Sequence, residues 1–175
     1  MQTDHVDRIL SQWQHERPEL DPLAMSIFGR LWRLNAIASK AVERVHLEYG
    51  LTQPEFDVLA TLRRSGEPYQ LSPTALYTSL MLSSGAMTNR LDKLEARGFI
   101  YREPSPEDRR SMLVALTKTG LALINETMTA HVANEQHLLM SLDHAQQQQL
   151  ADLLRTLLLN IGKDQADTVE LDSHS

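Results

Sequence analysis

Residues 72–116 carry the most specific structural pattern in this chain of 175 residues. Ser72-Pro73 places an N-cap residue before a proline at the first helical position, which predicts a short helix over Pro73–Leu80. Ser83-Ser84-Gly85 begins a second predicted helix, which we expect to end at Gly98 because glycine favours a helix C-terminus. Two compact helices joined by a tight turn form a helix-turn-helix unit.

Two short apolar segments follow the second helix. Phe99–Glu103 and Ser111–Leu116 have the length and composition of strands, and the proline-containing turn Pro104–Arg110 joins them into a β-hairpin. A helix-turn-helix followed by such a hairpin is a winged helix-turn-helix, whose second helix typically enters the major groove of DNA. The predicted fold class is therefore mainly α with a small β-hairpin, as a winged helix-turn-helix domain plus flanking helices.

Helical patterns flank this unit on both sides. Thr52-Gln53-Pro54-Glu55 has the sequence of a capping box, which predicts a helix start. The polar segment after Gly162 is expected to be frayed or disordered. The expected flanking helices cover Asp4 to about Gln14, Met25 to about Tyr49, Gln53 to about Arg64, Thr117 to about Leu142, and Asp143 to about Asn160.

The net charge of −6 at pH 7 is unevenly distributed along the chain. The segment Ser72–Gly120 contains seven Lys and Arg residues against five Asp and Glu residues, so its net charge is +2, whereas the rest of the chain carries −8. Binding to phosphates requires only a local positive surface. The charge distribution therefore permits nucleic-acid binding by an acidic protein.

Composition argues against several other functions. The chain contains no cysteine, which excludes disulfides, thiolate zinc sites and thiol redox sensing. None of the seven histidines stands in zinc-site order, and the common phosphate-binding and nucleophile motifs are absent from the sequence. We therefore expect no metal, no cofactor and no enzymatic activity. Without a long apolar run or a signal-peptide pattern, we expect a cytoplasmic protein with no membrane partner.

The second helix of the predicted motif has a buried stripe and a polar face. Leu91 and Leu94 fall close to Met87 when successive residues advance by about 100°, so these three residues form the buried stripe. The opposite face carries small and hydrogen-bonding side chains that can contact base edges and phosphates, although an ordinary solvated face is the alternative. The candidate DNA-binding residues of this helix are Ser84, Gly85, Thr88, Asn89 and Lys93.

The predicted turn of the hairpin contains two adjacent arginines, Arg109 and Arg110. Arginine at such a wing tip can enter the minor groove, where narrow A·T tracts concentrate negative potential. Asp108 can pair with Arg110 and brace the turn. A solvated charge pair of little energetic weight is the alternative. Arg109 and Arg110 are therefore candidate DNA contacts, and Asp108 is the candidate bracing residue.

Arg90 and Arg97 fall beside the buried stripe, so each needs an anionic or carbonyl partner. The helix Gln53–Arg64 is apolar nearly all round, and Asp57 within it also needs a partner. Asp57 and Arg90 could pair with each other. Such a pair would be either a structural salt bridge or part of a site where an anionic ligand competes for the arginine.

The segment LSSGAMTNRLDKLEARGFIYRE and the run DRRSMLVALTKTG resemble the MarR family of bacterial transcriptional regulators. The similarity extends from about Met25 to Gly162. The family's D-x-R…L-T-x-x-G pattern is carried by Asp108, Arg110, Leu116, Thr117 and Gly120.

The resemblance implies a homodimer held together by an α-helical dimerisation domain, in which each winged domain reads half of a pseudo-palindromic double-stranded DNA operator. It also implies a repressor that is released by a small anionic ligand. The implied regions are 1–22 as an N-terminal extension with a short extra helix, 23–50 and 121–163 as the dimerisation region, 51–120 as the DNA-binding region, and 164–175 as a polar tail.

A narrower resemblance is to the urate-responsive branch of the family, the HucR and PecS group. That branch has an additional N-terminal helix, and its ligand set is a tryptophan on this helix, an aspartate after the capping box and two arginines. The matching residues here are Trp13, Asp57, Arg90 and Arg102. The resemblance implies an aromatic or purine anion such as urate, xanthine or salicylate. The alternative for Trp13 is that it only anchors the extra helix. The alternative for the whole protein is that its winged fold contacts other proteins without specific DNA binding.

Overall fold

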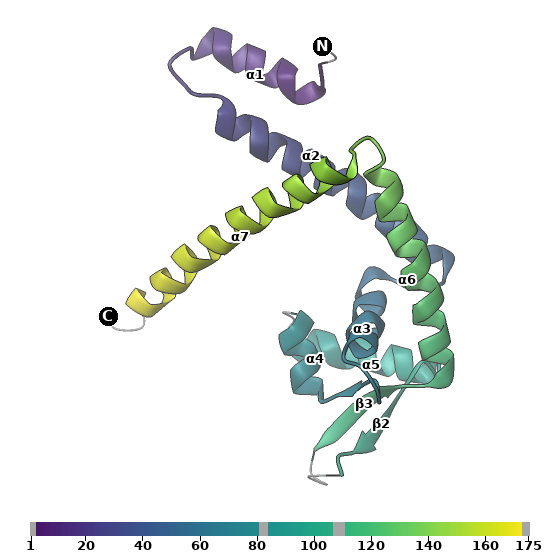
Figure 1. The fold of residues 1–175 in the computed structure, drawn as a ribbon. Helices are drawn as coiled ribbons and strands as arrows, with labels where there is room; N and C mark the ends of the chain where they lie inside the picture. The colour runs from purple at the N-terminus through teal and green to yellow at the C-terminus, as the bar shows by residue number, and fades with distance from the viewer. Residues whose placement is uncertain (1–2, 81–83, 107–110, 173–175) are drawn as a thin grey trace. The chain divides into compact units, whose positions relative to one another are not determined.

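The computed structural model describes residues 3–80, 84–106 and 111–172, with side chains for residues 3–80, 88–106 and 111–161. The chain forms two compact units, residues 1–135 and 136–175. In chain order the elements are α1 (His5–Glu16), α2 (Leu23–Glu48), α3 (Gln53–Arg64), β1 (Gln70–Leu71), α4 (Pro73–Leu80), α5 (Ser84–Ala96), β2 (Ile100–Pro104), β3 (Met112–Leu116), α6 (Lys118–Leu138) and α7 (His144–Asp172) (Figure 1).

The predicted winged helix-turn-helix is confirmed. The helix predicted over Pro73–Leu80 is α4, and the Ser72 hydroxyl caps it by accepting a hydrogen bond from the Ala75 amide at 3.1 Å. The second helix, α5, begins at Ser84 within the predicted start signal. The strands β2 and β3 form an antiparallel hairpin after it. The fold is therefore mainly helical with a small antiparallel sheet, as predicted.

The sheet contains one strand that the sequence did not predict. Its order is β1-β3-β2, and both pairings are antiparallel. Gln70 of β1 is opposite Ala115, and Tyr101 of β2 is opposite the same residue from the other side. The strand β1 has only two residues, which is too short for an alternating pattern to be recognisable.

One apolar cluster fills the interior of the winged helix-turn-helix unit. α6 contributes Ile124, which is fully buried, so the first turns of this long helix belong to the same core. Burial of each such side chain stabilises the fold by roughly 1.5–3 kcal/mol, and together they hold α5 against α3 and the sheet. The largest fully buried side chains that α3, α4, α5 and β2 contribute to this cluster are Leu59, Leu62, Leu76, Leu94 and Ile100.

The predicted extra N-terminal helix exists and packs on the start of α2. Asp4 and Asp7 form a capping box at its first turn, and Arg30 of α2 binds both carboxylates at 2.9 Å and 2.6 Å. Val6 is buried against Gly29, where an added Cβ would lie only 3.2 Å from Val6 Cγ1. The small residue therefore allows α1 and α2 to approach closely.

The last helix begins where predicted but continues farther. Asp143 and Gln146 cap it through reciprocal backbone-to-side-chain hydrogen bonds of 2.9 Å. The helix then runs to Asp172 and does not end near Asn160, so residues 163–172 of the segment that was expected to be frayed or disordered are helical. The segment contains no proline, and one interior glycine costs a helix only about 1 kcal/mol.

Candidate DNA-binding surface and ligand site

α5 has the two faces expected from its sequence. Leu91 and Leu94 are buried in the core, whereas Thr88, Asn89 and Lys93 are exposed to solvent. The other two DNA-binding candidates of this helix, Ser84 and Gly85, form its first turn, and their side chains lie outside the described residues. The described candidates therefore share one exposed, hydrogen-bonding face.

The strands of the wing are described, but its tip is not. β2 and β3 stay paired as far as Pro104 opposite Met112, and the Ser105 amide donates a hydrogen bond to the Ser111 carbonyl at 2.8 Å. The predicted DNA contacts Arg109 and Arg110 and the bracing residue Asp108 lie outside the described residues. Their roles stay predictions.

Arg102, at the base of the wing, is held by two carboxylates of α5, the recognition helix that the motif is expected to place in the major groove. Its Nη2 lies 2.6 Å from Asp92 Oδ1, and its Nη1 lies 3.3 Å from Glu95 Oε2. The Arg102 amide also donates to Glu95 Oε1 at 3.1 Å. These contacts join β2 to the exposed side of α5 and occupy the guanidinium that the resemblance assigns to a ligand.

Arg97 has the anionic and carbonyl partners that its place beside the buried stripe requires. Its Nη1 lies 3.2 Å from Glu55 Oε1, and its Nη2 donates to the Gly50 carbonyl at 2.8 Å. Its guanidinium also lies over the Phe99 ring, 4.8 Å from the ring centroid. The sequence indicates that Arg97 needs partners, but not that they come from the start of α3 and the end of α2.

Asp57 and Arg90 are close enough to interact electrostatically but are not bonded. Burial raises the pKa of the Asp57 carboxyl, and the hydrogen bond from Gln53 and the charge of Arg90 oppose this rise. Gln53 Nε2 donates to Asp57 Oδ1 at 3.0 Å, and no ion pair joins Asp57 to Arg90 in the described part of the chain. The direct pair that the sequence allowed is therefore absent among the described residues, and Asp57 is hydrogen-bonded instead by Gln53, one turn earlier on α3.

Arg90 lines a polar pocket of about 330 Å³ between the start of α3 and the side of α5. Neither Arg90 nor Lys93 forms an ion pair within the described residues. Two cations facing one volume can hold an anion. The pocket exists only in the tertiary structure, since two helices build it. Its lining residues are Thr52, Pro54, Glu55, Asn89, Arg90 and Lys93.

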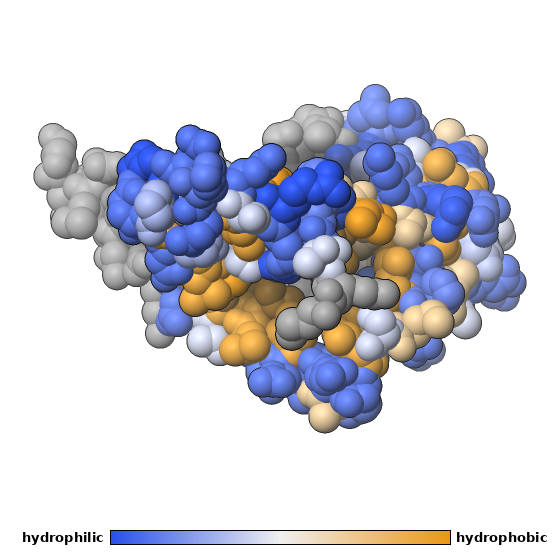
Figure 2. Space-filling view, turned by 90° about the horizontal axis from the view of Figure 1, so that it is seen from above, coloured by the Kyte–Doolittle hydropathy of each residue, from blue (hydrophilic) through white to orange (hydrophobic). Residues whose placement is uncertain are grey.

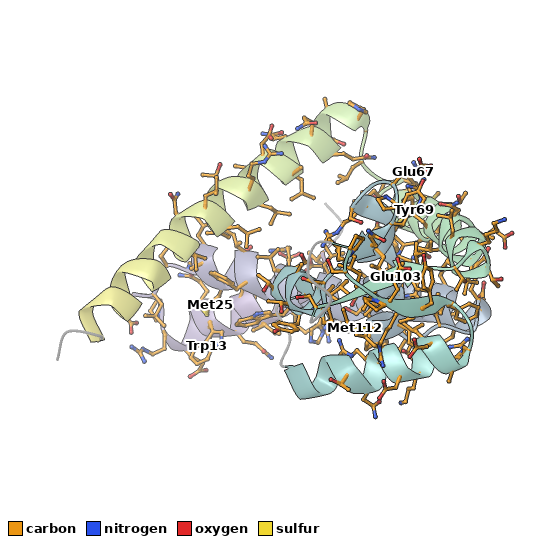
Figure 3. All side chains as sticks on the ribbon, turned by 90° about the horizontal axis from the view of Figure 1, so that it is seen from below. Trp13, Met25, Glu67, Tyr69, Glu103 and Met112 are labelled. Carbon is orange, nitrogen blue, oxygen red and sulfur yellow. The ribbon has the colours of Figure 1, made fainter. Side chains whose placement is uncertain are left out.

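Trp13 does not join the other three residues of the predicted ligand set. It lies on α1, which packs on α2, and 44% of its surface is exposed. Figure 3 labels Trp13 of α1 and Met25 of α2, the two helices that pack on each other. Among the described residues, neither Trp13 nor Arg102 forms a hydrogen bond or ion pair with Asp57. Of the four, the structure brings only Asp57 and Arg90 together.

The amino-acid sequence matches the MarR family over residues 51–112. The chain is also 41% identical to the HTH-type transcriptional regulator PecS of Dickeya dadantii (strain 3937) over 149 residues, which cover 85% of this chain and 90% of PecS. The chain belongs to the MarR family. The transcriptional repressor MprA of Escherichia coli (strain K12) is 30% identical, and the match covers 72% of this chain and 71% of MprA.

A solved MarR-family structure places the same fold on DNA. A mutant MarR from E. coli complexed with operator DNA is 26% identical, with a TM-score of 0.65 over 83% of this chain and 97% of that chain. This MarR-family member is thus a PecS-like, DNA-binding transcriptional regulator and not an enzyme, which favours DNA over a purely protein-binding role. None of its described helices is long and apolar enough to cross a membrane.

Sequence reasoning missed a buried polar cluster where α2, α3 and α6 meet in this MarR-family protein. His46 is fully buried, stacks on Phe56 with ring centroids 3.8 Å apart, and shares a hydrogen bond of 3.1 Å with His131 of α6. Burial and the neighbouring His131 lower the pKa of His46 to about 4. The sequence did contain one indication of this burial. His46 follows the apolar residue Val42 by four residues, so the two side chains share one face of α2.

Proposed function

We propose that this protein is a repressor that binds a pseudo-palindromic operator as a homodimer and is released by a small aromatic or purine anion. The observation that carries the proposal is the exposed face of α5, where Thr88, Asn89 and Lys93 lie together beside a paired wing. Side chains of this type can read base edges and neutralise phosphates. The first helix of the motif, α4, has eight residues against thirteen in α5 and offers a smaller surface.

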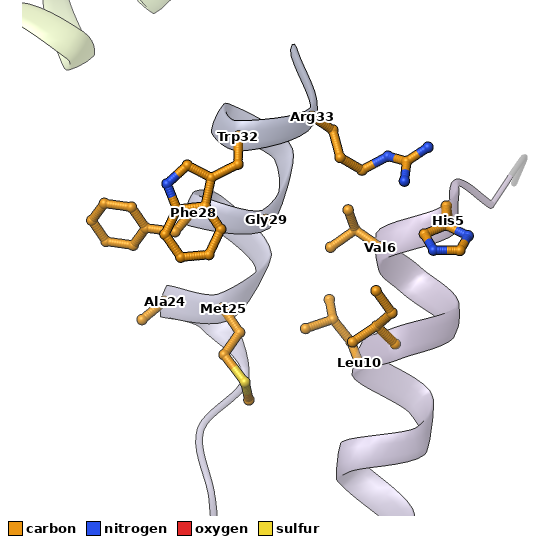
Figure 4. Close-up of a pocket in the computed structure, with 10 residues that line it drawn as sticks. His5, Val6, Leu10, Ala24, Met25, Phe28, Gly29, Trp32 and Arg33 are labelled. Carbon is orange, nitrogen blue, oxygen red and sulfur yellow. The ribbon is translucent and has the colours of Figure 1, made fainter. Parts of the chain in front are cut away.

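Exposed apolar side chains on α2 support the homodimer. Leu23, Trp32 and Ile37 are 62%, 70% and 58% exposed, and apolar residues reach the surface in several places (Figure 2). A groove of about 630 Å³ between α1 and α2 adds to this surface (Figure 4). A large exposed apolar surface typically marks an interaction site, and a second subunit would remove it from water. The apolar residues lining the groove are Val6, Ile9, Leu10, Ala24, Met25, Phe28 and Trp32.

α7 supports the same assignment within its own unit. Leu153, Leu158 and Leu159 are more than half exposed on this helix. We therefore assign residues 23–50 and 121–163 to dimerisation, 51–120 to DNA binding, and 1–22 to an extension that enlarges the apolar surface of α2.

The pocket beside α5 supports an anionic ligand. Arg90 and Lys93 face it without ion-pair partners in the described chain, and the Asp57 carboxyl nearby has a raised pKa. A bound anion would alter the charge next to the recognition helix. Arg102 could join such a site only if the ligand displaced its ion pairs with Asp92 and Glu95. Trp13 could join it only if α1 moved, or if the tryptophan came from the second subunit.

A two-stage binding experiment tests the proposal. Fluorescence anisotropy with a DNA fragment from the region upstream of the protein's own gene should show salt-sensitive binding, and an equally long unrelated fragment is the control. Urate, xanthine and salicylate are then added to the complex and, separately, to the free protein in a thermal-shift assay. Binding that ignores the DNA sequence would contradict the operator. A complex that no anion dissociates would contradict ligand release.

A further inference from the structure

Arg97 connects three elements that are distant in the sequence. It is the residue that follows α5, and its guanidinium reaches the carbonyl of Gly50 after α2 and the carboxylate of Glu55 in the first turn of α3. Gly50 has a positive φ of 69°, so the chain turns sharply out of α2 at that residue. The carbonyl at this turn is available to an outside donor, and Arg97 provides it.

The Glu55 side chain is also held by Thr52, independently of its contact with Arg97. Its Oε2 accepts hydrogen bonds from the Thr52 amide at 2.8 Å and from the Thr52 hydroxyl at 2.9 Å, which leaves Oε1 for Arg97. Burial alone would raise the pKa of the Glu55 carboxyl, but the hydrogen bonds from Thr52 and the contact with Arg97 outweigh burial and lower it. A fixed, charged carboxylate is a directional partner for an arginine fork.

The contacts of Arg97 differ from those expected of a DNA contact. Its guanidinium is occupied by Glu55, the Gly50 carbonyl and the face of Phe99, whereas Lys93, one turn earlier, is exposed and unpaired within the described chain. The charge of Arg97 is therefore used between elements of the protein. Its side chain is a direct polar link between the end of the recognition helix and the turn after α2.

We propose that Arg97 is a positioning residue that fixes the recognition helix relative to α2 and so determines which half-site spacing the dimer accepts. The inference rests on the proposed function, because α2 is assigned to dimerisation there. In a dimer, the separation of the two recognition helices follows from how each is held on the dimerisation helices. Loss of the Arg97 contacts widens the range of α5 orientations, so operators with altered spacing compete better.

Arg63 provides a matched control. It also forms a hydrogen bond between elements, from Nε to Asn125 Oδ1 at 2.8 Å, and its guanidinium lies 4.9 Å from the centroid of the Tyr69 ring. These contacts join α3 to α6 and to Tyr69, the residue before β1, and do not involve α5. Arg63→Gln therefore removes a similar set of interactions without releasing the recognition helix.

The experiment compares full-length wild type, Arg97→Gln, Arg97→Lys and Arg63→Gln on one operator series. The natural operator is used together with versions in which the half-sites are one or two base pairs closer or farther apart, and affinities and their salt dependence are measured by anisotropy. We expect wild type and Arg63→Gln to prefer the natural spacing by about tenfold or more, and Arg97→Gln by less than about threefold. The slope of log affinity against log salt should stay the same in Arg97→Gln, because no phosphate contact is lost.

Three results would overturn the inference. They are an unchanged spacing preference in Arg97→Gln, an equal loss of preference in Arg63→Gln, and a salt slope that falls by about one in Arg97→Gln, which would make Arg97 a phosphate contact. If Arg97→Gln does not fold, Arg97→Lys decides the matter, since it keeps the charge but loses the fork and should show an intermediate preference. Absence of any wild-type operator complex would instead refute the proposed function, and this inference with it.

Discussion

Gly120 lies directly against the backbone of Phe99, so that a Cβ added to Gly120 would stand 1.9 Å from the Phe99 carbonyl oxygen. The same oxygen accepts a hydrogen bond from the Thr117 amide at 3.1 Å. Thr117 in turn caps the start of α6, because its hydroxyl accepts from the Gly120 amide at 2.9 Å. The L-T-x-x-G motif is thus the joint between the base of the wing and the long helix α6.

Gly120→Ala should therefore destabilise the protein strongly. The new methyl group would collide with backbone, which cannot yield as a flexible side chain does, so we expect a loss of at least about 3 kcal/mol in urea unfolding. Gly66→Ala is the control, because a Cβ there meets nothing within 4 Å and only the positive φ of 83° opposes it, at a cost of about 1 kcal/mol. Similar losses in both variants would contradict a steric role for Gly120.

Lys93→Ala should weaken operator binding through the phosphate backbone. We expect a lower affinity for all sequences and a salt slope reduced by about one. Arg110→Ala should act in the same way if the wing tip contacts DNA, with the melting temperature unchanged. Arg8→Ala, which removes an exposed charge from α1, should alter neither quantity. Affinities equal to wild type in both test variants would place the DNA contacts elsewhere.

Asp57→Ala should impair ligand release more than operator binding. Asp57 belongs to α3 and lies near Arg90. Loss of its carboxylate therefore changes the charge around the pocket and leaves the exposed side chains of α5 in place. Trp13→Phe tests the other end of the predicted ligand set. The measurement is the anion concentration that dissociates half of the operator complex, with Gln12→Ala on the same helix as control. An unaltered concentration in both variants would remove the predicted urate-like site.

Stability should fall below about pH 6.5 because of His46. The pKa of His46 is lowered to about 4 in the folded protein, whereas an unfolded histidine titrates near 6.5, so the unfolded chain takes up the proton first. The loss begins as pH falls through about 6.5, amounts to about 2 kcal/mol by pH 5, and is complete below about pH 4.

Urea unfolding at about pH 7.5 and about pH 5 measures this effect. His46→Gln should remove most of the pH-dependent loss, at the expense of some stability at neutral pH. His137→Gln is the matched control because that histidine is exposed on α6. If His46→Gln retained the full wild-type pH dependence, another group would have to account for it.

Trp32→Glu should separate the proposed dimer. Trp32 is more exposed than Phe28, the other aromatic residue of α2, and a carboxylate there would be buried without a partner in an apolar interface. We expect a monomer by analytical ultracentrifugation and operator affinity lowered by about tenfold or more. Lys40→Glu, at an exposed polar position of the same helix, should remain dimeric. A dimeric Trp32→Glu would move the interface away from this face.

Local signals account for the parts of the fold that were predicted well. The Ser72-Pro73 cap, the glycine after α5 and the two short apolar segments act over a few residues, so each specified its element without knowledge of the rest. β1 was missed because its two residues acquire strand character only by pairing with β3. The extent of α7 was underestimated because the segment after Gly162 is polar and was expected to fray, although polar residues are compatible with a helix.

The candidate sites also have one part that local sequence predicted and one part that it did not. The sequence by itself determined that α5 has a buried stripe of leucines and an opposite polar face, because a helix of fixed period sorts side chains by position alone. Only the tertiary structure decided the partners of the arginines, since Arg97 meets Glu55, and Arg102 meets Asp92, through the packing of separate elements. Charge and burial require that such groups find partners, but which partner is reached depends on distances that exist only once the core has formed.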